Sequence, residues 1–232
     1  MKNKLAEFQN KLSIRFKDEL LLKQVFVHRS YLNEHKDFEV GHNERLEFLG
    51  DAVLELVVTE YLYSNYSEPE GVLTNWRSAL VKGESLSELS KKIGIDDLLM
   101  LSFGESKNKG KGRNLILANA LEALIGAIYL DQGYKSVSKF IQNNLIVNLK
   151  DIIEKELFID NKSKLQELVQ EKFSITPHYE LLSEKGPDHD KIFVMEVKLG
   201  DHEIGQGSGN SKQRAEQMAA HDALDKFDDI KH

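Results

Sequence analysis

Residues 42–58 read HNERLEFLGDAVLELVV, and the interpretation of the whole chain starts from this stretch. In a helix, Glu44, Glu47 and Asp51 stand at positions i, i+3 and i+7, so their carboxylates fall within roughly 60° of one another. The positions around them are almost all apolar, which is typical of a helix buried inside a domain. Carboxylates in such a place repel one another and lose solvation, unless a cation or a proton lies among them. The alternative is an ordinary acidic stripe on a solvent-exposed face.

A second apolar stretch, residues 116–131, reads ILANALEALIGAIYLD. Asn119 and Glu122 interrupt it at i, i+3 spacing, and buried polar groups of this kind need partners. They form either a satisfied polar pair in the core or two more oxygen ligands, if this helix crosses the first one. Ligand sets made only of oxygen suit Mg²⁺ or Mn²⁺ rather than zinc.

Length and composition describe an ordinary globular protein without covalent cross-links. The chain has 232 residues, of which 41% are hydrophobic and 30% charged, enough for one large or two modest domains. It has no cysteine, which excludes disulfides and thiolate metal sites and favours a reducing cytoplasm. We expect no membrane segment, no signal peptide and no organic cofactor.

The net charge of −7 argues against a nucleic-acid partner unless a local basic face exists. One candidate is the glycine-rich run at residues 102–113, SFGESKNKGKGR, which we expect to be a loop. It carries Lys107, Lys109, Lys111 and Arg113. Such a run is usually solvated, but its place just before the second acidic helix makes contact with phosphate a reasonable hypothesis.

Residues 43–51, NERLEFLGD, resemble the signature of the ribonuclease III family without a gap. The resemblance implies an all-α catalytic domain that hydrolyses phosphodiester bonds in double-stranded RNA with Mg²⁺, for which Mn²⁺ can substitute. The products would carry 5′-phosphate and 3′-hydroxyl ends, as in the processing of ribosomal and messenger RNA precursors. It also implies a homodimer, with the bulky apolar Phe48 as a candidate interface anchor.

The same resemblance assigns roles to the acidic residues. It implies that the metal ligands are Glu47, Asn119, Glu122 and Asp51, and that the catalytic group comprises Asp51, Glu122, Glu44 and Glu70. Glu70 opens an EGxLxxxR pattern, although an acid in a first helical turn also simply complements the helix dipole. The family most often has Asp at the position of Asn119, so we expect weaker metal binding here. The alternative function is a non-catalytic, double-stranded-RNA-binding dimer.

The rest of the N-terminal part is expected to be helical, and we interpret His28 as a packed or capping residue. The expected helices cover residues 4–13, 19–27, a long segment from Glu70 interrupted near Gly83, and residues 134–157, with a polar turn at 61–69. The pattern predicts a helical domain at 1–156, a linker at 157–161 and a second domain at 162–230.

The second domain is expected to have the order α-β-β-β-α. Its predicted elements are a helix at 163–173, strands at 178–182, 192–199 and 203–209, and a helix at 210–227. This α+β arrangement resembles a double-stranded-RNA-binding domain, whose contacts would be Gln166, Glu167, His189, Lys212, Gln213 and Arg214. Lys212 and Arg214 fall in the first turn of the last helix, where free N–H groups favour phosphate, and Asn210 is the expected cap.

Overall fold

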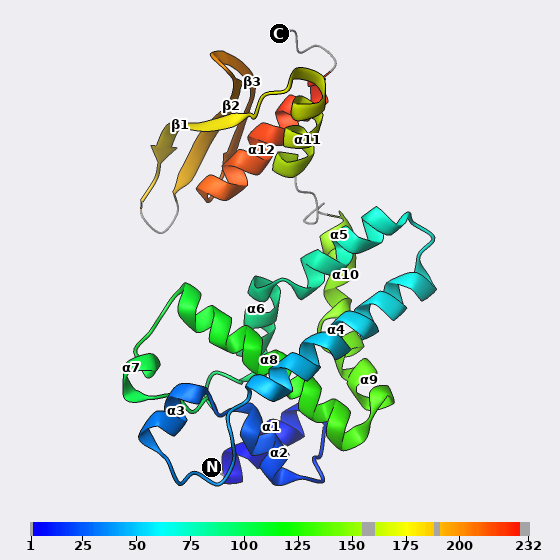
Figure 1. The fold of residues 1–232 in the computed structure, drawn as a ribbon, viewed down its shortest axis with the longest axis vertical. Helices are drawn as coiled ribbons and strands as arrows, with labels where there is room; N and C mark the ends of the chain where they lie inside the picture. The colour runs from blue at the N-terminus through cyan, green and yellow to red at the C-terminus, as the bar shows by residue number, and fades with distance from the viewer. Residues whose placement is uncertain (1, 155–160, 188–190, 228–232) are drawn as a thin grey trace. The chain divides into compact units, whose positions relative to one another are not determined.

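The computed structural model describes residues 2–154, 161–187 and 191–227, in two compact units, Met1–Phe158 and Ile159–His232. The described part of the first unit is helical apart from one isolated β-bridge (Figure 1). Its elements are α1 (Lys2–Leu12), α2 (Glu19–Val25), α3 (Arg29–Glu34), α4 (Glu44–Asn65), α5 (Glu70–Val81), α6 (Gly83–Ile93), α7 (Phe103–Ser106), α8 (Lys111–Gln132), α9 (Tyr134–Asn144), a 3₁₀ turn (Ile146–Asn148) and α10 (Leu149–Glu154).

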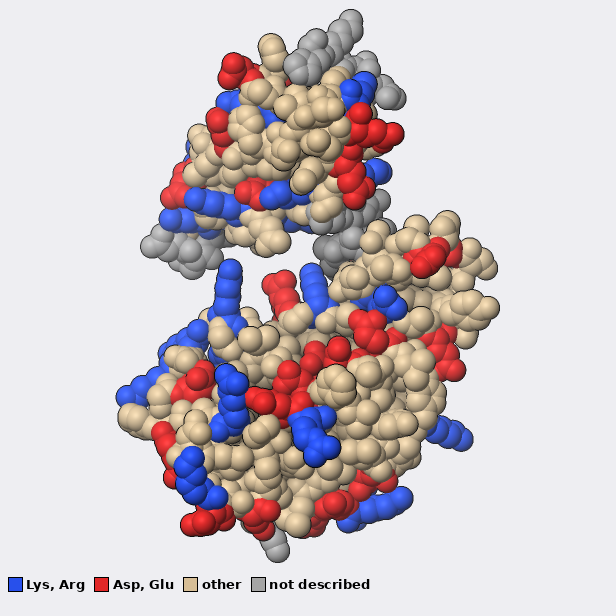
Figure 2. Space-filling view, in the orientation of Figure 1, with Lys and Arg blue, Asp and Glu red and all other residues tan. Residues whose placement is uncertain are grey.

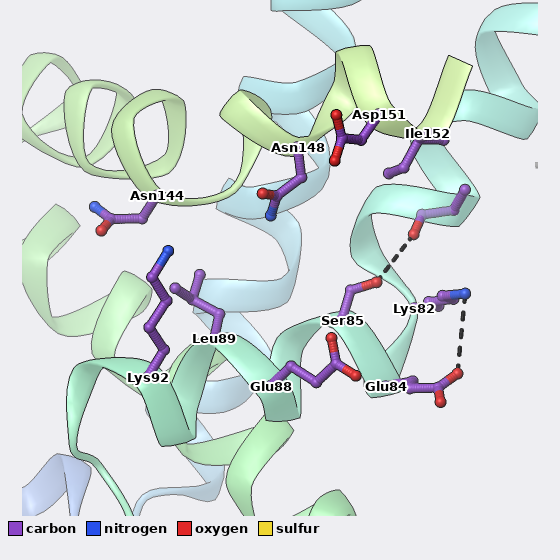
Figure 3. Close-up of a pocket in the computed structure, with 11 residues that line it drawn as sticks. Lys82, Glu84, Ser85, Glu88, Leu89, Lys92, Asn144, Asn148, Asp151 and Ile152 are labelled. Atoms are coloured by element: carbon purple, nitrogen blue, oxygen red, sulfur yellow. Dashed lines mark hydrogen bonds and ion pairs between the residues drawn. The ribbon is translucent and has the colours of Figure 1, made fainter. Parts of the chain in front are cut away.

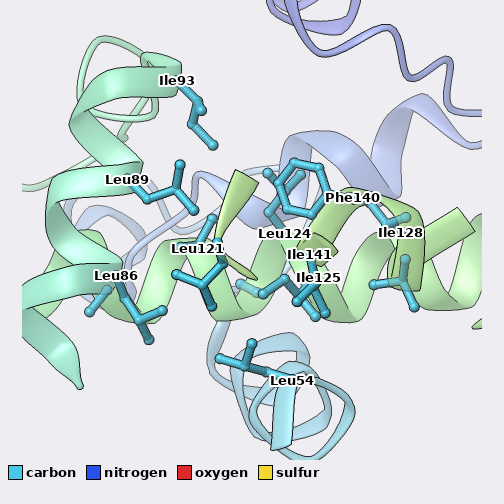
Figure 4. Packing of buried hydrophobic residues seen from close by; sticks show 14 of the residues in the cluster. Leu54, Leu86, Leu89, Ile93, Leu121, Leu124, Ile125, Ile128, Phe140 and Ile141 are labelled. Carbon is cyan, nitrogen blue, oxygen red and sulfur yellow. The ribbon is translucent and has the colours of Figure 1, made fainter. Parts of the chain in front are cut away.

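The core of this unit forms where α4 and α8, each of 22 residues, cross. Leu121, Leu124, Ile125 and Ile128 of α8 are fully buried, and α4, α6 and α9 surround them with apolar side chains (Figure 4). Among the described helices, only α8 is long and apolar enough to cross a membrane, with a mean hydropathy of 1.3. However, 56% of that window is buried within the protein, as in the core helix of a globular domain.

In the first unit, three boundaries differ by several residues from those expected, and in the second unit β1 continues to Lys185 instead of ending at Leu182. Helix α4 continues to Asn65, because Leu62 is 2% exposed in the core, so the turn begins only at Tyr66. The segment from Tyr134 does not form one helix: α9 ends at Asn144, and the change of direction at Leu145 lets Leu145 and Ile146 both enter the core. Helix α8 begins at Lys111, inside the run expected to be a loop.

The second unit has the expected α-β-β-β-α order, with α11 (Asn161–Phe173), β1 (His178–Lys185), β2 (Ile192–Leu199), β3 (His202–Gly209) and α12 (Lys212–Asp225). The strands form an antiparallel sheet in the order β1-β2-β3. Helices α11 and α12 pack on one face of it (Figure 1). Glycines in β3 allow that contact, since a Cβ at Gly207 would lie 2.1 Å from the backbone nitrogen of Ala219. The core consists of Leu165, Val169, Met195, Val197, Leu199 and four alanines of α12.

Candidate active site

Two glycines allow α4 and α8 to cross in direct backbone contact. A Cβ added at Gly50 would lie 1.7 Å from the carbonyl oxygen of Glu122, and one added at Gly126 would lie 2.3 Å from that of Leu46. Because no side chain separates the two helices here, polar residues next to the crossing come close together. These are Glu47 and Asp51 from α4, and Asn119 and Glu122 from α8.

Electrostatic coupling shows that the four groups share one environment. Burial, together with the charges of Asp51 and Glu47, raises the pKa of Glu122 to about 7. Burial also raises the pKa of Glu47, with contributions from Glu44 and Asp51, while a hydrogen bond from Asn119 opposes the rise. The crossing therefore collects more negative charge than its surroundings neutralise.

The chemistry of these groups fits a hard divalent cation. All four offer oxygen donors, and in the described parts of the chain neither Glu47, Asp51 nor Glu122 forms an ion pair with Lys or Arg. Among the residues that the structure describes, no three Asp, Glu or His side chains lie close enough together to form a metal site by themselves. Binding an ion would thus have to draw the carboxylates together and use the amide oxygen of Asn119.

A hollow of about 410 Å³ opens beside this group. It is lined by His28, Arg29, Asn43, Glu44, Glu47, Leu115, Ile116 and Asn119. Glu44 lies 3.6 Å from the guanidinium of Arg29 and 3.7 Å from Nδ1 of His42. Figure 2 shows acidic side chains along α4 on the visible face, with Lys and Arg on either side.

Sequence reasoning missed Asn43, His28 and Arg29 at this hollow. Asn43 is 3% exposed, and its side-chain amide donates to the carbonyl of Val25 over 3.0 Å, which anchors the start of α4. His28 was interpreted as structural, and it does cap α3, but its ring also lines the hollow. The available signal was the sequence HRS at residues 28–30, shortly before the acidic helix.

Within one chain, Glu70 lies away from the other acids predicted for the site. It lines a different hollow of about 450 Å³, together with Tyr63, Glu68 and Arg77. Arg77 is already engaged, with Nε 3.0 Å from the Glu55 carboxylate and Nη1 donating to Thr59 over 2.9 Å. A single chain therefore does not bring Glu70 to the crossing of α4 and α8.

A third hollow, also of about 450 Å³, lies between α6 and the segment from α9 to α10 (Figure 3). Its lining carries both signs of charge, including Lys82, Lys92, Glu88 and Asp151, together with the apolar Leu89 and Ile152. It contains none of the residues predicted for the site.

The basic run at 102–113 is more ordered than expected. Arg113 lies in the first turn of α8 and its Nε donates to Asp96 over 2.8 Å, so it is paired within the protein. Lys107 lies with its ammonium 3.9 Å from the ring centre of Phe103. Lys109 and Lys111 remain exposed beside them.

In the second unit, the residues expected to contact RNA are solvent-exposed where the structure describes them. Gln166 and Glu167 lie on α11, and Lys212, Gln213 and Arg214 form the first turn of α12. Basic side chains gather at the end of this unit where α12 begins (Figure 2). The cap of α12 is Ser211, whose Oγ accepts from the N–H of Arg214 over 3.1 Å, so the expectation for Asn210 was wrong. His189 lies outside the described residues.

Comparison with known proteins covers both units. Residues 18–149 match the family model described as Ribonuclease-III-like, and residues 161–227 match the double-stranded RNA binding motif. Proteins named Ribonuclease 3 are similar over nearly the whole chain: one from Treponema denticola is 44% identical over 94% of this chain and 89% of its own, and one from Streptococcus pneumoniae is 43% identical over 97% of each. The crystallised nuclease domain of Campylobacter jejuni ribonuclease III is 36% identical, with a TM-score of 0.55, over 64% of this chain and 97% of its own.

Proposed function

This chain belongs to the ribonuclease III family and is an endoribonuclease of double-stranded RNA, and from that premise we propose that it uses Mg²⁺ bound at the crossing of α4 and α8. The proposed ligands are Glu47, Asn119, Glu122 and Asp51. The products carry 5′-phosphate and 3′-hydroxyl ends, and Mn²⁺ can substitute. The compartment is the cytoplasm, which the absence of cysteine supports.

The observation that carries this proposal is the half-buried carboxylate of Glu122 beside two other carboxylates. Burial and neighbouring negative charge raise the pKa of this group to about 7, and a nearby cation would stabilise its ionised form against both effects. When bound, a divalent ion supplies Lewis-acid activation of water and neutralises charge at the phosphate. Glu47 and Glu122 would hold the ion, and the Asn119 amide would add a neutral oxygen.

Besides holding the ion, the acids of the site orient water and backbone. Asp51 is exposed next to the crossing, where its carboxylate accepts a hydrogen bond from water approaching the phosphate. Glu44 is tied to Arg29 and His42, so it positions the side chains around the hollow. Glu70 lies in the other hollow, so its proposed role requires a homodimer that brings this hollow to the site of the partner subunit.

A homodimer is supported by unpaired apolar surface on α4. Phe48 is 83% exposed, Leu56 56% and Tyr63 81%, and their spacing puts all three within roughly 80° on one helical face. A second structure of the Campylobacter jejuni ribonuclease III nuclease domain, 38% identical with a TM-score of 0.53 over 59% of this chain and 95% of its own, is described as showing structural flexibility in a region involved in dimer formation. Two copies would place one centre against each RNA strand.

The test is a cleavage assay on duplex RNA with Mg²⁺ titrated from zero to saturation. We expect cleavage that requires the ion, and its loss in Glu122→Ala with duplex binding near that of the unaltered chain. The alternative, a non-catalytic RNA-binding dimer, draws on the neutral Asn119. Intact duplex at saturating Mg²⁺ and Mn²⁺, with binding retained, would establish that alternative.

A further inference from the structure

The imidazole of His28 is oriented by a chain of hydrogen bonds that begins on a distant loop. The backbone N–H of Ser102 donates to Oγ of Ser30 over 3.0 Å, and Oγ of Ser30 lies 2.8 Å from Nδ1 of His28. The bond from Ser102 uses a lone pair of the Ser30 oxygen, so the hydroxyl proton of Ser30 is free to point at Nδ1 of His28. The N–H of Ser30 also approaches Nδ1, at 3.3 Å, which completes the cap of α3.

These contacts assign the proton of the ring. A nitrogen that accepts from two donors carries no proton, so the neutral imidazole carries its proton on Nε2. Burial lowers the pKa of His28, and Arg29 and His42 act in the same direction, while Glu105 and Glu44 oppose them. The ring is therefore neutral near pH 7 and presents Nε2–H as a hydrogen-bond donor.

That donor belongs to a side chain that lines the hollow beside the proposed metal ligands. Within the described residues, Nε2 has no hydrogen-bond partner, whereas Nδ1 is fully used. The same hollow is lined by Glu47 and Asn119, so a group bound here lies next to the reacting phosphate. Arg29, 71% exposed at the rim, is the positive charge at this hollow, and Leu115 adds exposed apolar surface.

We propose that the hollow between His28, Arg29 and Leu115 binds the RNA phosphodiester next to the one that is cleaved, with Nε2–H of His28 donating to a non-bridging oxygen. The inference rests on the proposed function, because it assumes cleavage at the neighbouring acids. A lone donor beside a guanidinium suits an anionic acceptor. Leu115 would contact the ribose between the two phosphates.

Two substitutions separate this role from capping. His28→Asn keeps a side chain that caps helices well but is too short to reach the hollow, so the variant loses only the Nε2 donor. His28→Gln places an amide N–H near the position of Nε2 and loses the cap. Asp18→Asn, at the cap of α2, is the matched control for a cap exchange away from the hollow.

We expect His28→Asn to have the same melting temperature as the unaltered chain. It should cleave a defined duplex about 10- to 100-fold more slowly in single turnover, as for loss of one hydrogen bond to a charged group. His28→Gln should cleave faster than His28→Asn although it is less stable. If His28→Asn cleaves like the unaltered chain, while His28→Gln and His28→Ala lose activity in step with stability, the ring is only a cap and the proposal is overturned.

Modified substrates test the contact itself. A methylphosphonate in place of the adjacent phosphodiester should slow the unaltered chain but add little to the defect of His28→Asn. The phosphate assignment is wrong if the rate defects of the methylphosphonate and of His28→Asn multiply. It is also wrong if the non-additive effect appears with a 2′-deoxyribose at this position instead of the methylphosphonate. Failure of the proposed function has a different signature: the unaltered chain would leave unmodified duplex intact with Mg²⁺, and this inference would fall with it.

Discussion

Gly50 lies against the backbone carbonyl of Glu122, so close that a Cβ on Gly50 would stand 1.7 Å from that oxygen. The reverse contact, Gly126 against the carbonyl of Leu46, closes the same crossing from the other helix. The separation of the carboxylates on α4 and α8 is thus set by two missing side chains.

Adding one methyl group at the crossing should force the helices apart. We expect Gly126→Ala to cost about 1–3 kcal/mol or more in free energy of unfolding, because its Cβ meets backbone that cannot rotate away. The measurement is chemical denaturation. Gly112→Ala, in the same helix with nothing within 4 Å of its Cβ, is the matched control and should be neutral or slightly stabilising. Equal stability of both variants would mean that α4 and α8 can move apart at the crossing without lowering the free energy of unfolding.

The raised pKa of Glu122 predicts a trade-off between stability and metal binding. In the folded chain this pKa is about 7, against 4.5 for an unperturbed Glu, so the folded state holds its proton more tightly than the unfolded state. Stability should therefore fall as pH rises from about 4.5 to 7 and stay low above 7. In EDTA at pH 8, Glu122→Gln should be more stable than the unaltered chain by about 2 kcal/mol, allowing for partial exposure.

Denaturation curves at pH 4.5 and pH 8 check this, since the difference should nearly vanish at the lower pH. Mg²⁺ should stabilise the unaltered chain more than Glu122→Gln. An advantage of Glu122→Gln that is the same at both pH values would indicate packing rather than charge as its cause.

Asn119 should determine how much Mg²⁺ the enzyme needs. In Asn119→Asp, a fourth carboxylate would strengthen attraction for the cation, and we expect the half-saturating Mg²⁺ concentration for cleavage to fall about tenfold, equivalent to about 1.4 kcal/mol. Asn119→Ala, which removes the oxygen, should raise it. An unchanged Mg²⁺ requirement in both variants would exclude Asn119 from the ligands.

The sequence predicted the acidic group well because helical periodicity fixes which residues share a face. The spacing put Glu47 and Asp51 on one face of α4 but left open whether the second helix brings Glu122 to them, and in the structure the three carboxylates are coupled. Periodicity could not bring in His28, because its place depends on backbone contacts with a distant segment, including His28 N–H to the carbonyl of Met100 at 3.1 Å.

Tertiary contacts also explain the wrong start of α8. The sequence KGKGR has poor helix propensity, which favoured a loop. In the folded chain, Arg113 binds Asp96 and the side chain of Asn114 accepts from Lys91 over 2.7 Å, and these contacts hold the first turn of the helix. The helix that closes the α-β-β-β-α order was predicted correctly because it has a continuous alanine face.

The first turn of α12 should supply salt-dependent affinity for duplex RNA. Lys212 and Arg214 are exposed there and form no ion pair within the described residues, so each is free to neutralise a phosphate. Replacing either with Ala should weaken binding and reduce the slope of log K against log salt by about one. Lys226→Ala, at the opposite end of the helix and already bound to Asp222 at 2.7 Å, should leave that slope unchanged. If all three substitutions act alike, the attraction comes from overall charge, and the turn that Ser211 caps has no special part in binding.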